Sequence, residues 1–231
     1  MDSKISSDLL SDPAFVAPDP EKMVAHALEH GKRGDPTSIL KSMDEYCWKY
    51  AKRSMNIGDT KGVILDSLFK ERDPKVAIEL GSFVGYSAVR MARFLKDGGK
   101  LYCLEINPEY AKLVEKLVDY AGLLDKICII VGTSDEVIPT LKAKHGIDKL
   151  DFVFIDHMKA LYKPDLISLI KNDLLAKGSV VVADNVIYPG APEYLEYVRN
   201  EPLFKSTFFK SHLEYRPEVE DGLEKSVFLG K

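Results

Sequence analysis

Short apolar runs alternate with helical patterns through the middle of the chain, between residues 75 and 183. The runs are KVAIEL, KLYCLE, KICIIV, LDFVFI and GSVVVA, each rich in Val, Ile or Leu. Strands that are apolar on both sides must be covered on both faces, and a helix between two strands makes those strands parallel. The alternation therefore predicts an α/β fold in which helices cover both faces of a mostly parallel sheet.

Three helical segments precede the first of these strands. Apolar residues recur three and four positions apart near residues 20–30, 36–52 and 60–71, which is the spacing of one helix face. Residues 1–18 hold no such period and contain scattered Ser, Asp and Pro, so we predict a flexible N-terminal tail. The rest of the chain, residues 19–231, fits the size of a single domain.

The second half of the chain has one well-marked helix and an unusual ending. Asn107 can cap a helix that Gly122 ends, between the second and third strands. Near the C-terminus we predict a helix around 192–200 and two strands around 204–213 and 224–229. These strands follow one another closely enough to pair antiparallel. The sheet is therefore expected to end in a C-terminal antiparallel strand.

The charge and the cysteines limit the partners of the chain. Its 231 residues carry a net charge of −4 with no dense Lys/Arg block, which argues against a nucleic-acid partner. No run reaches the roughly 18 apolar residues of a membrane span, and the N-terminus lacks a signal-peptide pattern. Cys47, Cys103 and Cys128 show no CxxC spacing, which suits free thiols in a reducing compartment. We predict a cytoplasmic monomer that acts on a small molecule, without a membrane partner.

The first strand ends in a glycine turn, within IELGSFVGYS. A dinucleotide fingerprint would need glycines where Phe83 and Tyr86 stand, and no Gly-Lys-Ser/Thr follows for a P-loop. The turn at Gly81 and Gly85 still lets a ligand approach the backbone, and Glu105 at the next strand's end can accept two ribose hydroxyls. The pattern favours a nucleoside without an obligatory pyrophosphate. The alternative is a tight strand-to-helix turn that binds no ligand.

Acidic residues also end the fourth and fifth strands. If these strands are neighbours, Asp156 and Asp184 lie about 5 Å apart, and carboxylates that close repel unless a proton or a cation lies between them. Asn185 adds a third oxygen, and oxygen ligands without His or Cys suit Mg²⁺. Such an ion keeps positions for a vicinal diol, for example a catechol. The alternative is a capped turn at Asp184 beside a solvated Asp156.

The stretch FVFIDHMKALY places two more ionisable side chains after Asp156. Lys159 follows it by three residues, and a cation beside Mg²⁺ has its pKa lowered, which makes this amine a candidate general base. A solvated surface lysine is the alternative. His157 could act as a base or a metal ligand, but a lone His packed against a ligand is the commoner case, so we predict a binding role only.

Six motifs give the chain a resemblance to a known family. They are SMNIGDTKG, ELGSFVGYSAVRMARFL, EINPEY, IDHMK, ADNVIYPGAP and LEYRPEVEDGLEK. Over about residues 24–230 the chain resembles the catechol O-methyltransferases, small Mg²⁺-dependent enzymes that use S-adenosylmethionine. The resemblance implies a Rossmann-like class I methyltransferase fold, and methyl transfer from S-adenosylmethionine to one hydroxyl of a Mg²⁺-chelated catechol.

The resemblance also implies roles for single residues. Lys159 would take the proton from the attacking hydroxyl, and Glu214 would hydrogen-bond the second hydroxyl. The other implied substrate contacts are Asn185 and Pro189. The implied metal ligands are Asp156, Asp184 and Asn185. The implied contacts of the methyl donor are Met55, Ile57, Gly81, Tyr86, Ser87, Glu105 on the ribose, Ser134, Asp156 and His157.

Two departures from the family pattern concern the acceptor pocket. The family has Trp where this chain has Arg53 and Met158, and those indoles wall the catechol ring. A cation and a flexible thioether should leave the pocket more open and favour a catechol that bears a carboxylate. Trp48 could replace one of the missing indoles. Further departures near the donor site are Phe83 for Tyr, Asp135 for Gln and Leu161 for Arg.

Other functions stay open on the sequence. A metal-dependent O-methyltransferase for another vicinal diol would share every motif, and a non-catalytic binding protein could keep the fold. A nicotinamide-dependent oxidoreductase shares the strand–helix alternation but needs pyrophosphate-binding glycines. A hydrolase that uses His157 would need a G-x-S-x-G nucleophile elbow, which the sequence lacks.

Overall fold

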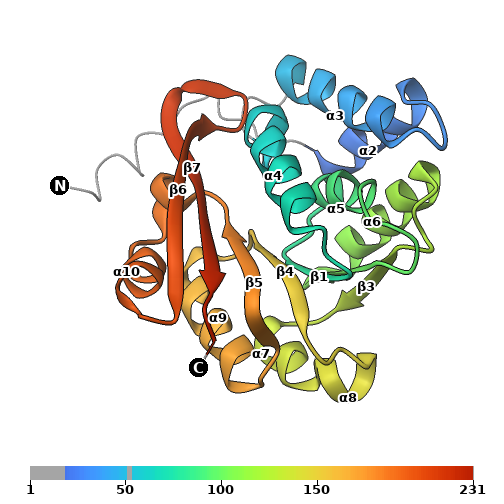
Figure 1. Ribbon diagram of the computed structural model, residues 1–231. Helices are drawn as coiled ribbons and strands as arrows, with labels where there is room; N and C mark the ends of the chain where they lie inside the picture. The colour runs from blue at the N-terminus through green and yellow to red at the C-terminus, as the bar shows by residue number, and fades with distance from the viewer. Residues whose placement is uncertain (1–18, 51–53, 231) are drawn as a thin grey trace.

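The computed structural model of the chain describes residues 19–50 and 54–230, so the predicted tail of residues 1–18 lies outside the described part. One seven-stranded sheet forms its centre, with the strand order β3-β2-β1-β4-β5-β7-β6 (Figure 1). The strands are β1 (Val76–Leu80), β2 (Lys100–Glu105), β3 (Ile127–Val131), β4 (Leu150–Ile155), β5 (Leu175–Ala183), β6 (Phe204–Leu213) and β7 (Arg216–Phe228). β1 to β5 are parallel, and β7 pairs antiparallel with both β5 and β6. The predicted sheet is confirmed.

Helices cover both faces of this sheet (Figure 1). One face carries α2 (Pro20–His30), α3 (Pro36–Tyr50), α4 (Gly58–Arg72), α5 (Tyr86–Ala92) and α6 (Pro108–Ala121). The other carries α7 (Ser134–Val137), α8 (Leu141–His145), α9 (Tyr162–Lys171) and α10 (Pro192–Asn200). The capping prediction for α6 holds, because Asn107 Oδ1 accepts a hydrogen bond from the Glu109 amide at 2.9 Å and Gly122 adopts a left-handed φ of 72°.

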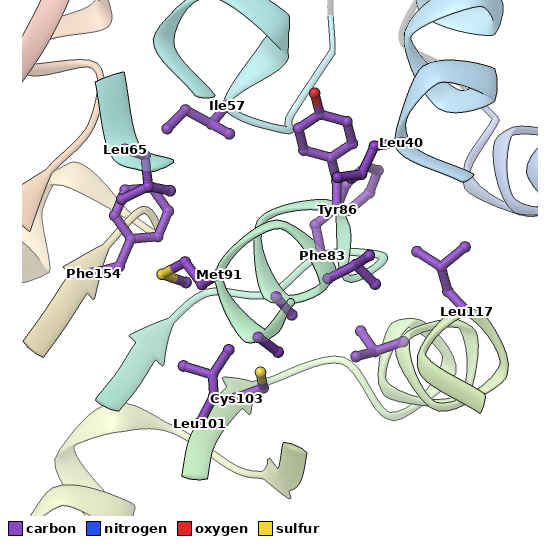
Figure 2. Packing of buried hydrophobic residues seen from close by; sticks show 14 of the residues in the cluster. Leu40, Ile57, Leu65, Phe83, Tyr86, Met91, Leu101, Cys103, Leu117 and Phe154 are labelled. Carbon is purple, nitrogen blue, oxygen red and sulfur yellow. The ribbon is translucent and has the colours of Figure 1, made fainter. Parts of the chain in front are cut away.

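Alternate residues of each strand face two separate hydrophobic cores. In β4, Phe152 and Phe154 pack with α2 to α6, whereas Val153 and Ile155 pack with α7 to α10. Figure 2 shows the first core, where labelled side chains from β2, β4 and helices α4 to α6 point toward one another. Truncating a fully buried Phe costs about 3–5 kcal/mol, so these two cores hold the strands, and hence the strand ends, in place.

The last strand is longer than the predicted 224–229. It begins at Arg216, and the pattern missed residues 216–223 because Pro, Gly and several acids make them unlike a strand. They become a strand by pairing with β6 in a hairpin. Only residues 224–227 pair with β5. The rest of β7 therefore extends beyond the carboxyl end of β5, on the side of α4 (Figure 1).

The carboxyl ends of β1, β4 and β5 are aligned by backbone hydrogen bonds. The amide of Asp156 donates to the Leu80 carbonyl at 2.9 Å, and the amide of Asp184 donates to the Ile155 carbonyl at 3.0 Å. The acids that follow β4 and β5 therefore lie side by side at one edge of the sheet, as predicted. No helix within residues 19–50 and 54–230 has the length and apolar character to cross a membrane.

Candidate active site

A cavity of about 690 Å³ opens at the carboxyl ends of the parallel strands. Most residues that the sequence singled out line this cavity. They are Met55, Gly81, Glu105, Ser134, Asp156, His157, Lys159, Asn185, Pro189 and Glu214. Ile57, Tyr86, Ser87 and Asp184 are buried and do not line it. The fold therefore brings the two predicted groups, those for a donor and those for an acceptor, to one space.

The glycine turn after β1 lines the cavity through Gly81 and Phe83. Gly81 has a φ of 90°, and a Cβ there would lie 2.7 Å from the Asp156 carbonyl oxygen, so only glycine fits without displacement. The Glu105 carboxylate holds the turn: Oε2 accepts from the amides of Ser82 at 3.2 Å and Phe83 at 2.8 Å, while Oε1 accepts from the Asn107 amide at 2.9 Å. A carboxylate oxygen has further lone pairs, so these bonds orient Glu105 without saturating it.

Tyr86 and His157, two predicted contacts of the methyl donor, each have a side-chain partner that does not line the cavity. Tyr86 Oη donates to Asp44 Oδ1 at 2.8 Å within α3 and accepts from Arg90 at 2.8 Å. The His157 Nε2 atom lies 2.7 Å from Asp165 Oδ2. Its Nδ1 atom is buried and has no hydrogen-bond partner among the described residues. Nδ1 is thus the ring atom of His157 that no described residue engages.

The oxygen set, which we define as Asp156, Asp184 and Asn185, follows β4 and β5, and two of its members, Asp156 and Asn185, line the cavity. Burial raises the pKa of Asp156 to about 6, with Lys159 lowering it and Glu214 raising it. Lys159 Nζ donates to Asp156 Oδ1 at 3.2 Å and to Asn185 Oδ1 at 3.1 Å, and it also contacts the Tyr162 hydroxyl. The amine therefore bridges two members of the oxygen set rather than lying solvated on the surface.

A second acidic group adjoins the oxygen set and was not predicted as such. Asp184, Glu214 and Asp221, which we call the acidic triad, each place an oxygen within 4.8 Å of the others. Asp221 comes from the part of β7 that overhangs the sheet. The amine of Lys61, from α4, lies among them with no exposed surface. Burial alone would lower the pKa of Lys61, but the three carboxylates raise it well above its usual value.

Lys61 and Asp221 stood inside motifs that the sequence analysis quoted, SMNIGDTKG and DGLEK. They received no role there, because a lysine or an aspartate in a polar stretch is usually solvated. The Lys61 amine donates a hydrogen bond to Asp221 Oδ2, and the two residues lie 160 positions apart in the sequence. A contact between such distant residues leaves no periodic pattern in the sequence. The buried ion pair of Lys61 and Asp221 could therefore not be predicted from either motif.

Four of the five departures from the family pattern line the cavity. Met158 lines it and is 67% exposed, and Phe83, Asp135 and Leu161 line it too. Trp48 does not line it: its indole N–H donates to Asp59 at 2.9 Å and its ring packs edge-on against Tyr215, with ring centroids 5.4 Å apart. Trp48 therefore does not take the place of a missing indole. Arg53 lies outside the described residues.

Three comparisons place this geometry among known proteins. The model of a family described as O-methyltransferase matches residues 30–208. The chain is 47% identical to "Catechol O-methyltransferase" of Mus musculus, over 91% of this chain and 78% of that protein. It is equally 47% identical to "Catechol O-methyltransferase B" of Danio rerio, over 91% and 79%. A crystal structure of an O-methyltransferase from Streptomyces achromogenes, in complex with SAM, matches over 100% of both chains with a TM-score of 0.71 and 21% identity.

Proposed function

The chain belongs to the O-methyltransferase family, and we propose that it transfers a methyl group from S-adenosylmethionine to one hydroxyl of a catechol held on Mg²⁺. The fold is that of class I methyltransferases, as the structural match indicates. Relatives that are 47% identical and are named catechol O-methyltransferase support catechol as the acceptor.

The observation that carries this proposal is that two chemically different sets of residues line one cavity. Gly81, Glu105 and Ser134 line it at one end, and Lys159 and Asn185 line it at the other. A methyl transfer requires the acceptor oxygen, the methyl carbon and the donor sulfur to lie in line within one space. The volume of about 690 Å³ is in the range of sites that enclose ligands of this size.

The chemistry of the oxygen set fits Mg²⁺. All three residues offer oxygen donors, which Mg²⁺ prefers, and Asp184 Oδ2 is buried without a hydrogen-bond partner among the described residues. An orphaned buried carboxylate oxygen is costly unless a cation or a proton meets it. Mg²⁺ held there would lower the pKa of the acceptor hydroxyl and orient the diol.

Residues of the chain supply the remaining steps at the acceptor. We assign Lys159 as the base that takes the proton from the attacking hydroxyl, since its amine lies beside Asp156 and Asn185. Glu214 would hydrogen-bond the second hydroxyl through Oε2, because Lys61 and Asn185 both engage Oε1. Pro189 would wall the ring. These contacts would hold a particular one of the two catechol oxygens in line with the methyl group.

Residues at the other end would bind the donor. We assign Glu105 to the ribose hydroxyls, with its orientation already set by three backbone amides. Met55, Ser134 and His157 would line the rest, and the backbone at Gly81 would let the donor approach closely. The remaining predicted donor residues, which lie behind the wall, would shape it by packing: Ile57, Tyr86 and Ser87.

Transfer of a labelled methyl group from S-adenosylmethionine to a panel of catechols and other vicinal diols, with and without Mg²⁺, tests the proposal. Transfer to catechols that requires Mg²⁺ is expected. Transfer only to other diols would favour the broader O-methyltransferase alternative. No transfer to any diol, despite donor binding measured by calorimetry, would favour a binding protein instead.

The base assignment has its own test. Lys159→Ala should lower kcat by about 100-fold or more, the usual contribution of a positioned base, while donor binding changes little. Lys163→Ala is a matched control, because that lysine lies on the next helical turn with its amine over the Tyr197 ring, and it should leave kcat unchanged. Equal losses of turnover and donor affinity in Lys159→Ala would sink the assignment.

We further propose a reducing compartment, such as the cytoplasm, as the place of action. All three cysteines are free, with Cys47 and Cys103 buried, and burial raises the pKa of the Cys47 thiol to about 11, so that this thiol stays protonated and unreactive. The predicted monomeric state can be measured by sedimentation.

A further inference from the structure

Lys61 is a fully buried lysine in the first turn of α4. Its Nζ atom lies 2.6 Å from Asp184 Oδ1, 2.5 Å from Glu214 Oε1 and 2.7 Å from Asp221 Oδ2. Burying an amine is costly unless it is paired and hydrogen-bonded. A lysine ammonium has three N–H donors, and here three different carboxylates meet them, so the amine is satisfied and at the same time brings a positive charge to each of the three acids.

The acidic triad has the spacing of a cation site, and the amine fills it. Its three oxygens lie within 4.8 Å of one another, and divalent cations such as Mg²⁺ and Mn²⁺ bind carboxylate oxygens. The Lys61 amine contacts all three of them. Asp184 belongs to the oxygen set as well, and its Oδ2 atom is left buried without a partner among the described residues. One oxygen of Asp184 therefore faces a cation already present, and the other remains for a second cation.

The filled triad also orients Asn185. The Asn185 Nδ2 atom donates to Glu214 Oε1 at 2.8 Å and to Asp221 Oδ2 at 2.9 Å. Because both donors of the amide point to the triad, Oδ1 points to the side where Lys159 Nζ lies 3.1 Å away. Asp221 Oδ1 further accepts from the amide of Tyr188 at 3.0 Å. The triad thus anchors both a member of the oxygen set and the turn that carries Pro189.

We propose that the Lys61 amine acts as a built-in cation, which occupies the acidic triad and so directs the divalent cation to the oxygen set. The inference rests on the proposed function in that it assumes one divalent cation at the oxygen set. Without the amine, three negative charges would lie together and would draw a second cation into the triad. An ion there, which with its bound waters is bulkier than the amine, would take Glu214 Oε1 as a ligand and shift this carboxylate, so that Oε2 would no longer lie where the acceptor hydroxyl needs it.

Counting bound ions tests this role. The full chain is titrated with Mn²⁺, whose free concentration is read by electron paramagnetic resonance. One ion per chain is expected in the wild type and two in Lys61→Ala, which removes the charge and leaves room for an ion with its waters. Lys61→Ala combined with Asp221→Asn breaks the triad and should return the count to one. Lys225→Ala, which removes an amine paired with Glu71 on the surface, should keep one.

Affinity for 4-nitrocatechol, measured by its absorbance change in the presence of Mn²⁺, gives a second readout. It should fall at least tenfold in Lys61→Ala and stay unchanged in Lys225→Ala. A count of one ion in Lys61→Ala, at wild-type affinity, overturns the proposal. No ion in the wild type contradicts the proposed function instead, so the two failures are distinguishable. If Lys61→Ala unfolds without metal, Mn²⁺ should restore folding where K⁺ at equal ionic strength does not; failure to refold in Mn²⁺ also counts against the proposal.

Discussion

Glu79 allows a quantitative test of the electrostatics beneath the site. It lies in β1, fully buried, and neither carboxylate oxygen has a hydrogen-bond partner among the described residues. Burial raises its pKa from the ordinary 4.5 to about 7, an effect that the nearby hydroxyls of Ser87 and Ser82 only partly offset. At about 1.4 kcal/mol per pKa unit, the shift corresponds to about 3 kcal/mol.

The sign of the effect follows from proton binding. The folded state holds the Glu79 proton more tightly than the unfolded state, so its contribution to stability is fully present below pH 4.5 and is lost as the pH rises through about 7. Glu79→Gln is neutral in both states and carries no such dependence. The free energy of unfolding of the wild type, relative to that of Glu79→Gln, should therefore fall by about 2.5 kcal/mol between pH 5 and pH 8.

Urea unfolding at the two pH values, at constant ionic strength, measures this difference. Glu109→Gln is the matched control, because the Glu109 side chain is 72% exposed and pairs with Lys112 on the helix surface; its profile should parallel that of the wild type within about 0.5 kcal/mol. Parallel profiles for the wild type and Glu79→Gln would refute the reasoning, since they would mean that Glu79 has the same proton affinity in both states.

The remaining predictions concern the metal, the preference among catechols and the glycine turn. Excess chelator should abolish methyl transfer, and Ca²⁺, which is larger and less strictly octahedral, should restore it poorly compared with Mg²⁺ in the same assay. Arg53→Trp should remove a preference for carboxylate-bearing catechols over amine-bearing ones, seen as a change in the ratio of kcat/KM values. Gly81→Ala should lower the free energy of unfolding by about 1–3 kcal/mol in urea, because a left-handed φ and a 2.7 Å backbone contact both oppose a Cβ.

The parallel strands and the polar residues at their carboxyl ends were predictable, because local sequence patterns determine them. Apolar runs covered on both faces specify parallel strands, and the residue after each run must lie at the carboxyl edge. The sequence therefore predicted that Asp156 and Asp184 lie side by side if their strands are neighbours. The pairing of Ile155 with Ala183, the residues just before them, confirms this. The strand-end residues left the oxygen set and Lys159 open between a metal site with a base and solvated side chains; the family resemblance favoured the first, and these roles remain predictions.

Features that depend on contacts between distant segments were not predictable in the same way. The first half of β7 is polar, and it forms a strand only because β6 lies beside it. Trp48 has helical periodicity, but the pattern could not tell that its ring packs against Tyr215 rather than the cavity. A buried lysine such as Lys61 runs against the usual exposure of its residue type, and only the meeting of α4 with the β6–β7 hairpin reveals its partners.

Charge balance supports the proposal of one divalent cation at this edge of the sheet. The acidic triad and Asp156 contribute four carboxylates, while Lys61 and Lys159 contribute two amines, which leaves two negative charges in a buried region. The excess of negative charge affects the pKa of Asp184. Burial and the neighbouring carboxylates raise this pKa well above its usual value, although Lys61 lowers it. A divalent cation at the oxygen set would neutralise both excess negative charges, whereas a monovalent cation would leave one of them. A third lysine would leave no metal ligand position for a diol. The two amines therefore offset negative charge at two different places: Lys61 lies buried within the acidic triad, and Lys159 lines the cavity where, in the proposed reaction, the acceptor hydroxyl would lose its proton.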